Sequence, residues 1–251
     1  GDDFTTGSEH SEVYPCESFL DGFNNYGIGW LEPFSHTRFS FNTLYVADPF
    51  FSVWPGIAFL MLVVYDRFHR HRGFWWKLGL YIPIFYLVYC IGNKGYIDRD
   101  IRASLDRQQI TYTRYFTTPS PLNNWLWYVV AGTDQGYYVG FRSLFDRKQD
   151  VELNYFPRND SLLAPVADHE DLQHLIRFSQ GFYTVEKYRD TLLFNDLRFG
   201  QILGWQDPRQ QFVFHYYLQH PDDNRLVVQR GRFIGWNWTV VKNLWRRIRG
   251  V

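Results

Sequence analysis

PFFSVWPGIAFLMLVVY (49–65) and FWWKLGLYIPIFYLVYCIG (74–92) are two apolar segments separated by the short basic loop DRFHRHRG (66–73). The first segment has no charged residue. The second has only Lys77, which lies near one end, where its long side chain can reach the membrane surface. Each segment is close to the roughly 20 residues that a helix needs to cross a bilayer. Each also contains a proline, which membrane helices tolerate.

We therefore predict a transmembrane helical hairpin over residues 49–93, with the lipid bilayer as its partner. The alternative is a pair of buried helices in a soluble protein. The loop 66–73 carries three arginines against one aspartate. Because cytoplasmic loops carry an excess of Lys and Arg, this loop is predicted to be cytoplasmic. Three basic residues between 94 and 102 compete with this orientation.

Residues 94–251 are predicted to form a soluble α+β domain dominated by antiparallel strands. The charged segment KGYIDRDIRASLDRQQI (94–110) predicts a helical connector, and EDLQHLIRFSQG (170–181) has the apolar spacing of a short helix. The predicted strands are ITYTRYF (110–116), WLWYVVAG (125–132), YYVGFRSLF (137–145), VELNYF (151–156), QQFVFHYYLQ (210–219) and LVVQRGRF (226–233). The fold class is therefore a membrane α-helical hairpin plus a soluble α+β domain.

The composition excludes some classes of function. Lys and Arg total 26 in the 251 residues, as do Asp and Glu, so the formal net charge is zero. Without a global basic field, no nucleic acid is expected as a partner. The C-terminal WRRIRG (245–250) is interpreted as a solvated or lipid-facing basic end. The aromatic content of 20% fits a membrane interface, although a β-rich core would use aromatic residues too.

The segment before the hairpin contains the candidate metal ligands. Residues 1–16 form a polar tail without a signal peptide, and because the chain starts at Gly1 we expect further sequence upstream. Within the motif segment 17–48, LDGFNNYGIGWLEPFSH (20–36) places Asp21, Glu32 and His36 near one another along the chain, and Asp48 follows. Carboxylates and imidazoles bind divalent metals, and such a metal would activate water in a hydrolase. The alternative is a tight loop in which Asp21 caps a turn.

A second group of polar residues lies among the aromatic strands of the predicted domain. These residues could line a pocket or satisfy buried hydrogen bonds, and the second interpretation is favoured. They are Arg114, Asn123, Asn195, Asp196, Arg198 and Gln201. The sequence contains no GxSxG, P-loop, HExxH or dinucleotide fingerprint, so nucleophilic catalysis by Ser or Cys has no support.

The run LDGFNNYGIGWLEPFSHTRFSFNTLYVADPF (20–50), followed by an apolar helix, resembles the later part of the bacterial inner-membrane, YdjM-like family. Its members are described as membrane-bound metal-dependent hydrolases. RYFTTPSPLNNWLWYVV (114–130), FSQGFYTVE (178–186) and FNDLRFGQILGW (194–205) resemble the extended C-terminal domain of a Bacteroidetes-type branch. The resemblance covers about residues 17–251. It implies a multi-pass protein of the bacterial inner (cytoplasmic) membrane that uses a divalent, zinc-like metal ion on an unknown substrate.

The family pattern has an upstream H-R-G-x-x-H-S motif, then H-x-x-x-D just before Y-G. Asp21 matches the aspartate of the second motif, but Glu17 stands where its histidine belongs, and the first motif is absent. The resemblance thus implies Asp21 as a metal ligand, with His36 and Asp48 as further candidates, and a chain that is inactive by itself. The alternative function is a non-enzymatic membrane protein whose soluble domain binds a partner or ligand.

Overall fold

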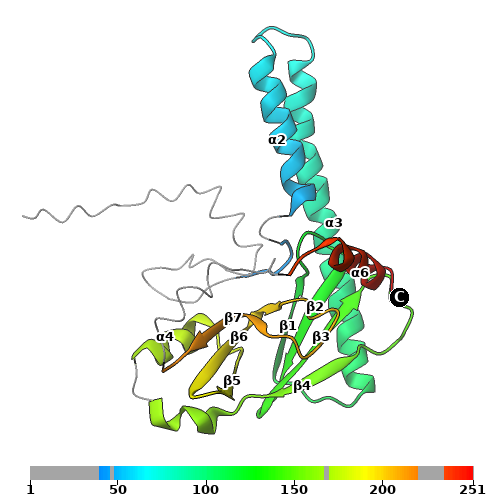
Figure 1. The fold of residues 1–251 in the computed structure, drawn as a ribbon. Coiled ribbons are helices and arrows are strands. Elements are labelled where there is room, and N and C mark those ends of the chain that lie inside the picture. The colour runs from blue at the N-terminus through cyan, green and yellow to red at the C-terminus, as the bar shows by residue number, and fades with distance from the viewer. Residues whose placement is uncertain (1–39, 46–47, 167–169, 220–234, 251) are drawn as a thin grey trace, which may run out of the picture.

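The computed structural model describes residues 40–45, 48–166, 170–219 and 235–250. A long helical hairpin projects from a domain built of two antiparallel sheets (Figure 1). The elements are α2 (Pro49–Val64), α3 (Arg72–Arg107), β1 (Arg114–Pro119), β2 (Leu126–Gly132), β3 (Gly136–Ser143), β4 (Leu153–Pro157), the 3-10 helix η1 (Asp160–Val166), α4 (Glu170–Phe178), β5 (Tyr183–Tyr188), β6 (Thr191–Gln201), β7 (Phe212–Tyr217) and α6 (Trp238–Ile248). The predicted α+β fold of antiparallel strands is confirmed.

Helices α2 and α3 pack against each other along the projecting hairpin (Figure 1). At its tip, the Arg72 side chain donates to the carbonyl oxygens of Leu62 at 2.6 Å and Tyr65 at 2.9 Å. These carbonyls belong to the end of α2, where the last turn of a helix lacks backbone partners. Arg72 therefore closes the hairpin.

Helix α3 is longer than the sequence analysis predicted. It runs unbroken for 36 residues, about 54 Å, so the predicted segment border at 93/94 falls inside one continuous helix. Gly92 and Gly95 do not break it, and the residues beyond them include good helix formers such as Arg99, Arg102, Ala103 and Leu105 and no proline. The helix enters the domain at Asn93, whose side chain donates to Asn124 Oδ1 at 2.9 Å.

The two hairpin helices pack closely at Gly79. A Cβ atom at this position would lie 2.5 Å from the Cβ of Ala58 on α2, whereas a Cβ at Gly92 would meet nothing within 4 Å. We expect Gly79→Ala to force the helices apart and cost about 1–3 kcal/mol of hairpin stability through overpacking. Gly92→Ala, by contrast, should stabilise α3 by up to about 1 kcal/mol through helix propensity. Thermal unfolding in detergent micelles checks both, and equal shifts in the two variants would contradict the packing.

The first sheet has the order β1-β2-β3-β4, and α3 covers one of its faces. Side chains alternate along β2, so Trp127, Val129 and Ala131 point to one face and Tyr128 and Val130 to the other. The first set packs against the lower half of α3, and the buried residues that α3 contributes are Ile97, Ile101 and Leu105. This half of α3 is therefore a core helix of the domain.

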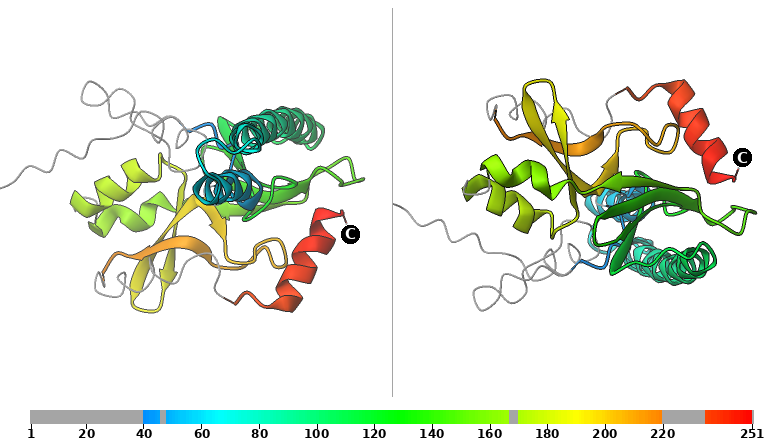
Figure 2. Two further views of the ribbon diagram at one scale, coloured as in Figure 1. Left: turned by 90° about the horizontal axis from the view of Figure 1, so that it is seen from above. Right: turned by 90° about the horizontal axis from the view of Figure 1, so that it is seen from below.

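The second sheet has the order β5-β6-β7 and packs against the other face of the first sheet. Tyr128 and Val130 meet Leu197 and Phe212 between the sheets. The far face of the second sheet is covered by α4 and η1, through the apolar cluster of Leu163, Leu172, Val185 and Phe194 with its neighbours. The layers are thus α3, first sheet, second sheet, and α4 with η1, and Figure 2 shows α4 and α3 on opposite sides. Strand β5 was not among the strands predicted from sequence, and the predicted strand 226–233 lies outside the described residues.

Candidate functional site

Asp48 is the one predicted metal ligand within the described residues. Its Oδ1 caps α2 by accepting from the backbone N–H groups of Phe50 at 2.9 Å and Phe51 at 3.3 Å, and its Oδ2 accepts from the Tyr86 hydroxyl at 2.8 Å. Both carboxylate oxygens of this buried side chain are therefore bound by protein donors. These contacts give Asp48 a structural role at the base of the hairpin.

Asp21 and His36 lie outside the described residues, so the predicted metal site stays a prediction. Within residues 40–45, 48–166, 170–219 and 235–250, no three His, Cys, Asp or Glu side chains gather as a metal ion would require.

A pocket of about 400 Å³ lies on the second sheet, on the face away from α4. Its volume falls within the range of about 300–1,000 Å³ that small-molecule sites occupy. Its floor comes from β5 and β6, and its walls come from the end of β4 and from the loop between β6 and β7. The lining residues are Phe156, Pro157, Asn159, Thr184, Val185, Glu186, Lys187, Tyr188, Leu193, Asn195, Arg209, Gln210, Gln211 and Phe212.

The floor of the pocket is a polar row that crosses the sheet. Thr184 and Asn195 line the pocket, and His215, which does not line it, continues the row, because the three residues are directly paired on β5, β6 and β7 and share one face. Asn195 is 1% exposed, and its Nδ2 donates to Glu186 Oε1 at 3.0 Å. Its Oδ1 has no hydrogen-bond partner among the described residues. A buried carbonyl oxygen without a partner costs about 1–3 kcal/mol, so a hydrogen-bond donor that reached Asn195 Oδ1 would offset this cost.

The pocket walls are held by side-chain to backbone hydrogen bonds. Gln201 Nε2 donates to the carbonyl oxygens of Pro208 at 2.7 Å and Gln210 at 2.9 Å, which fixes the loop that carries Arg209. On the opposite wall, Asn159 Nδ2 donates to the carbonyl oxygen of Val185 at 2.8 Å. The pocket is therefore shaped before any ligand enters it.

The protein groups nearest the pocket floor accept hydrogen bonds rather than donate them. His215 Nδ1 donates to the carbonyl oxygen of Phe212 at 3.0 Å. Burial lowers the pKa of His215, and the nearby Glu186 carboxylate only partly opposes this effect. His215 is therefore neutral at pH 7, which leaves the Glu186 carboxylate and the Asn195 carbonyl as the acceptors nearest the floor. Lys187 and Arg209 supply positive charge at the rim.

A second, smaller cavity of about 20 Å³ lies between the two sheets. Ser120 Oγ, Tyr128 Oη and Trp205 Nε1 all belong to its lining and are buried without a hydrogen-bond partner in the described part of the chain. A cavity of this size holds about one water molecule, which commonly binds two to four polar groups. The cavity thus fits an internal water rather than a substrate.

The polar residues singled out in the sequence divide between these roles. Asn195 lies on the pocket floor and Gln201 fixes a wall. Asn123 instead holds a turn, where its Oδ1 accepts from the backbone N–H of Leu126 at 2.8 Å. Asp196 and Arg198 form a bidentate ion pair, with distances of 3.1 and 2.7 Å, on the face of β6 opposite Asn195. Thr184, Glu186 and His215 were missed, although the alternation of polar residues in YTVEKY (183–188) carries the signal for two of them.

Comparison with known proteins adds no family to these observations. No family model matches the chain, and neither the curated proteins nor the solved structures contain a match.

Proposed function

We propose that the chain is a membrane-anchored binding protein. Its hairpin inserts into a lipid bilayer, and its α+β domain binds a small molecule in the pocket on β5 and β6. The observation that carries the proposal is the partnerless Oδ1 of buried Asn195 in a preformed pocket, on a domain attached to an apolar hairpin.

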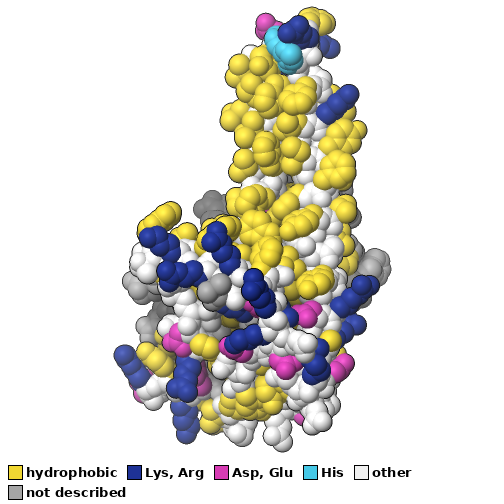
Figure 3. Space-filling model, turned by 90° about the vertical axis from the view of Figure 1, so that its right-hand side faces the viewer, with side chains coloured by type: hydrophobic (Ala, Val, Ile, Leu, Met, Phe, Trp, Pro, Cys, Tyr) yellow, Lys and Arg dark blue, Asp and Glu magenta, His cyan; other side chains and the backbone are white. Residues whose placement is uncertain are grey.

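The anchor is supported by apolar side chains that face outward all along the hairpin (Figure 3). Val64 on α2 is 74% exposed and Phe85 on α3 is 71% exposed. Soluble monomers rarely expose contiguous apolar patches larger than a few hundred Å². The helix Arg72–Arg107 is long and apolar enough to cross a bilayer, and only 11% of its most apolar window is buried, unlike a core helix of a soluble protein.

Helix α2 is short for a membrane span. Its 16 residues rise about 24 Å, against a hydrocarbon thickness of about 30 Å. A short span is accommodated by local thinning of the bilayer and by flanking cations that reach the headgroups. The basic residues of the tip loop, together with Lys77, are such flanking cations.

The ligand class follows from the polarity of the pocket floor. The carbonyl of Asn195 and the carboxylate of Glu186 both accept hydrogen bonds, so the bound molecule must present N–H or O–H donors. Tyr188, Phe156 and Phe212 add apolar surface against which a carbon skeleton packs. A small hydroxyl- or amine-bearing molecule satisfies both features.

Asn195→Leu tests the pocket. The variant keeps the branched shape of the side chain but removes the Oδ1 acceptor and the Nδ2 donor to Glu186, so binding should be lost. The free energy of unfolding should change by no more than about 1 kcal/mol, because removal of the costly buried acceptor offsets the lost hydrogen bond. Saturation-transfer NMR against a panel of small polyols, amines and carboxylates of equal size measures binding. Asn154→Leu, at an exposed asparagine of β4 outside the pocket, is the matched control. Binding that survives in Asn195→Leu, or a panel in which carboxylates alone bind, would refute the proposal.

The metal-dependent hydrolase remains a separate prediction. It depends on Asp21 and His36, and their contacts are not described. The predicted orientation, with loop 66–73 in the cytoplasm of a bacterial inner membrane, also stays a prediction. The four basic residues between 242 and 249 add cations to the opposite end of the hairpin.

A further inference from the structure

Helix α6 has a buried face and an exposed face. Val240, Leu244 and Ile248 are buried against the domain. A second face exposes Trp238 (71%) and Trp245 (47%), which lie about two turns apart on one side of the helix. The basic side chains Lys242, Arg246 and Arg249, all exposed, lie beside this aromatic strip, and the Arg249 guanidinium stacks over the Trp245 ring at 5.2 Å. Residues 235–250 contain no Asp or Glu. An exposed aromatic strip beside a basic strip is typical of a helix that lies in a membrane interface.

Aromatic contacts place α6 at the base of the hairpin. Trp245 packs edge to face on Trp125, with ring centroids 6.1 Å apart. Trp125 in turn packs on Phe50 in the first turn of α2 at 5.5 Å, and its Nε1 donates to the Tyr89 hydroxyl of α3 at 3.0 Å. Trp245 therefore lies at the level where the hairpin leaves the domain. Trp and Tyr are enriched at this level in membrane proteins.

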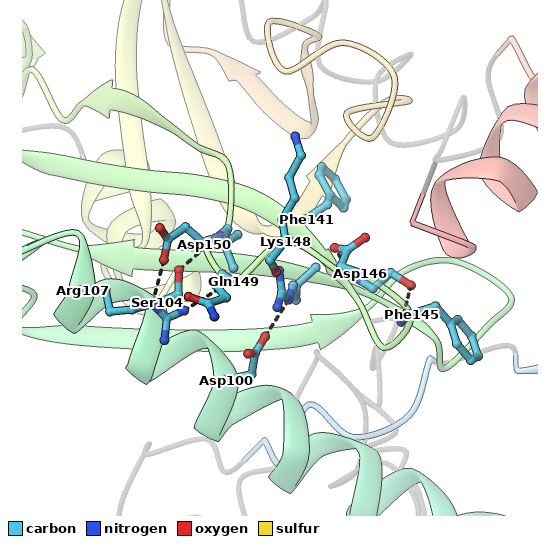
Figure 4. Close-up of polar contacts among 12 residues, drawn as sticks. Asp100, Ser104, Arg107, Phe141, Phe145, Asp146, Lys148, Gln149 and Asp150 are labelled. Atoms are coloured by element: carbon cyan, nitrogen blue, oxygen red, sulfur yellow. Dashed lines mark hydrogen bonds and ion pairs between the residues drawn. The ribbon is translucent and has the colours of Figure 1, made fainter.

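The orientation of α6 relative to the hairpin is fixed by polar contacts through the loop between β3 and β4 (Figure 4). Arg247 donates to both carboxylate oxygens of Asp146, at 2.6 and 3.1 Å, and to the carbonyl oxygen of Phe141 at 2.7 Å. Figure 4 shows Asp146 on the same loop as Asp150. Asp150 binds Arg107 of α3 at 2.8 Å.

A second contact joins the same loop to α3. The Ser104 hydroxyl accepts from the backbone N–H of Val151 at 2.8 Å. Because Trp245 packs on Trp125, which in turn packs on Phe50 of α2, α6 lies on the side of the domain from which the hairpin projects (Figure 1). In Figure 3, basic and hydrophobic side chains gather on the shoulder beside the hairpin.

We propose that α6 is a second membrane contact of the protein, which lies in the interface of a bilayer that contains anionic lipids. Trp238, Val241 and Trp245 enter the headgroup region, and Lys242, Arg246 and Arg249 bind the lipid phosphates. The proposal rests on the membrane insertion of the hairpin, because the hairpin sets the plane of the bilayer. The occupant is a lipid surface because apolar and cationic strips match the two chemistries of that surface, and because the face continues the base of the anchor.

The test uses nitroxide labels on the full chain in vesicles of phosphatidylcholine with phosphatidylglycerol. Single cysteines replace Val241 (membrane face), Gln135 (exposed turn between β2 and β3, at the end of the domain away from the hairpin) or Leu60 (hairpin) in a Cys16→Ser background, and that background treated with the same label is the reference for buried Cys90. Power saturation with oxygen and with a nickel chelate reports lipid and water exposure. We expect position 241 to be shielded from the chelate like position 60, and position 135 to remain accessible.

A charge-reversed variant measures the role of the cations. Lys242→Glu, Arg246→Glu and Arg249→Glu together should return position 241 to water, with a loss in partitioning on the order of fivefold for each cation removed. Position 60 should stay in lipid, because the hairpin is unchanged.

Each other result overturns the inference in a distinct way. Accessible labels at both 241 and 60 would refute the anchor itself. An accessible label at 241 with a lipid-embedded label at 60 would refute only the role of α6. If position 241 is shielded equally in vesicles with and without phosphatidylglycerol, anionic headgroups are excluded as the ligand. Dipolar broadening at 241, without lipid contact, would show that a second copy of the chain covers the face instead.

Discussion

Leu60→Asp combined with Leu80→Asp is expected to abolish membrane insertion of the hairpin. Both leucines face outward near the middle of the hairpin, with exposed fractions of 62% and 47%. An aspartate at the centre of a membrane helix costs about 3 kcal/mol, so the pair costs about 6 kcal/mol. Because both side chains point away from the contact between the helices, hairpin packing is left intact. Flotation of the expressed protein with membranes after carbonate extraction measures the loss.

The matched control carries the same two charges on the domain. Gln135→Asp and Tyr155→Asp lie at exposed positions of the β3 turn and of β4. This variant should float with membranes like the parent protein. Two results would contradict the prediction: the doubly substituted leucine variant stays in the membrane fraction, or the control variant is lost from that fraction as well. Either result would show that the exposed apolar side chains of the hairpin do not hold the chain in the membrane.

Asp196→Ala is expected to lower the free energy of unfolding by about 3–5 kcal/mol. Asp196 is fully buried and Arg198 is 5% exposed, so the substitution removes the bidentate carboxylate partner of a buried guanidinium. Stacking of Arg198 on Phe178 and Phe199, at 4.9 and 5.1 Å, does not replace a bidentate carboxylate. Thermal and denaturant unfolding, followed by tryptophan fluorescence in detergent micelles, gives the change.

Two further variants separate burial of charge from loss of a contact. Asp150→Ala removes the partner of Arg107 in an exposed ion pair, and should cost no more than about 1 kcal/mol. Asp196→Leu with Arg198→Met removes both buried charges and should recover most of the stability that Asp196→Ala loses. If the double variant is as unstable as Asp196→Ala, the packing of the two side chains, rather than the neutralisation of one buried charge by the other, stabilises the domain.

The sequence predicted those parts of the fold that depend on local patterns. The strands of the first sheet alternate apolar side chains between two buried faces, and the TDQG turn (133–136) marks their hairpin. The connector after residue 93 was predicted to be helical, but its union with the preceding apolar segment was not. A change from apolar to charged residues suggests a border, whereas the backbone of a helix continues through it unless a breaker intervenes.

The pocket could not be predicted because it depends on pairing between distant strands. Asn195 was singled out as a polar residue in an aromatic strand, but its neighbours come from β5 and β7. Their register places Thr184 and His215 beside Asn195. A shift by one residue would turn all three side chains to the opposite face of the sheet. Spacing along the chain contains no measure of that register.

One continuous helix, α3, connects the domain to its proposed membrane anchor. Its apolar half would lie among lipid tails, and its other half is locked into the core by Ile97, Ile101 and Leu105. In the proposed membrane arrangement, a tilt that the bilayer imposes on the apolar half of α3, through its thickness or lateral pressure, is transmitted along the same helix to the half that packs in the domain. The first sheet packs against that half and would turn with it.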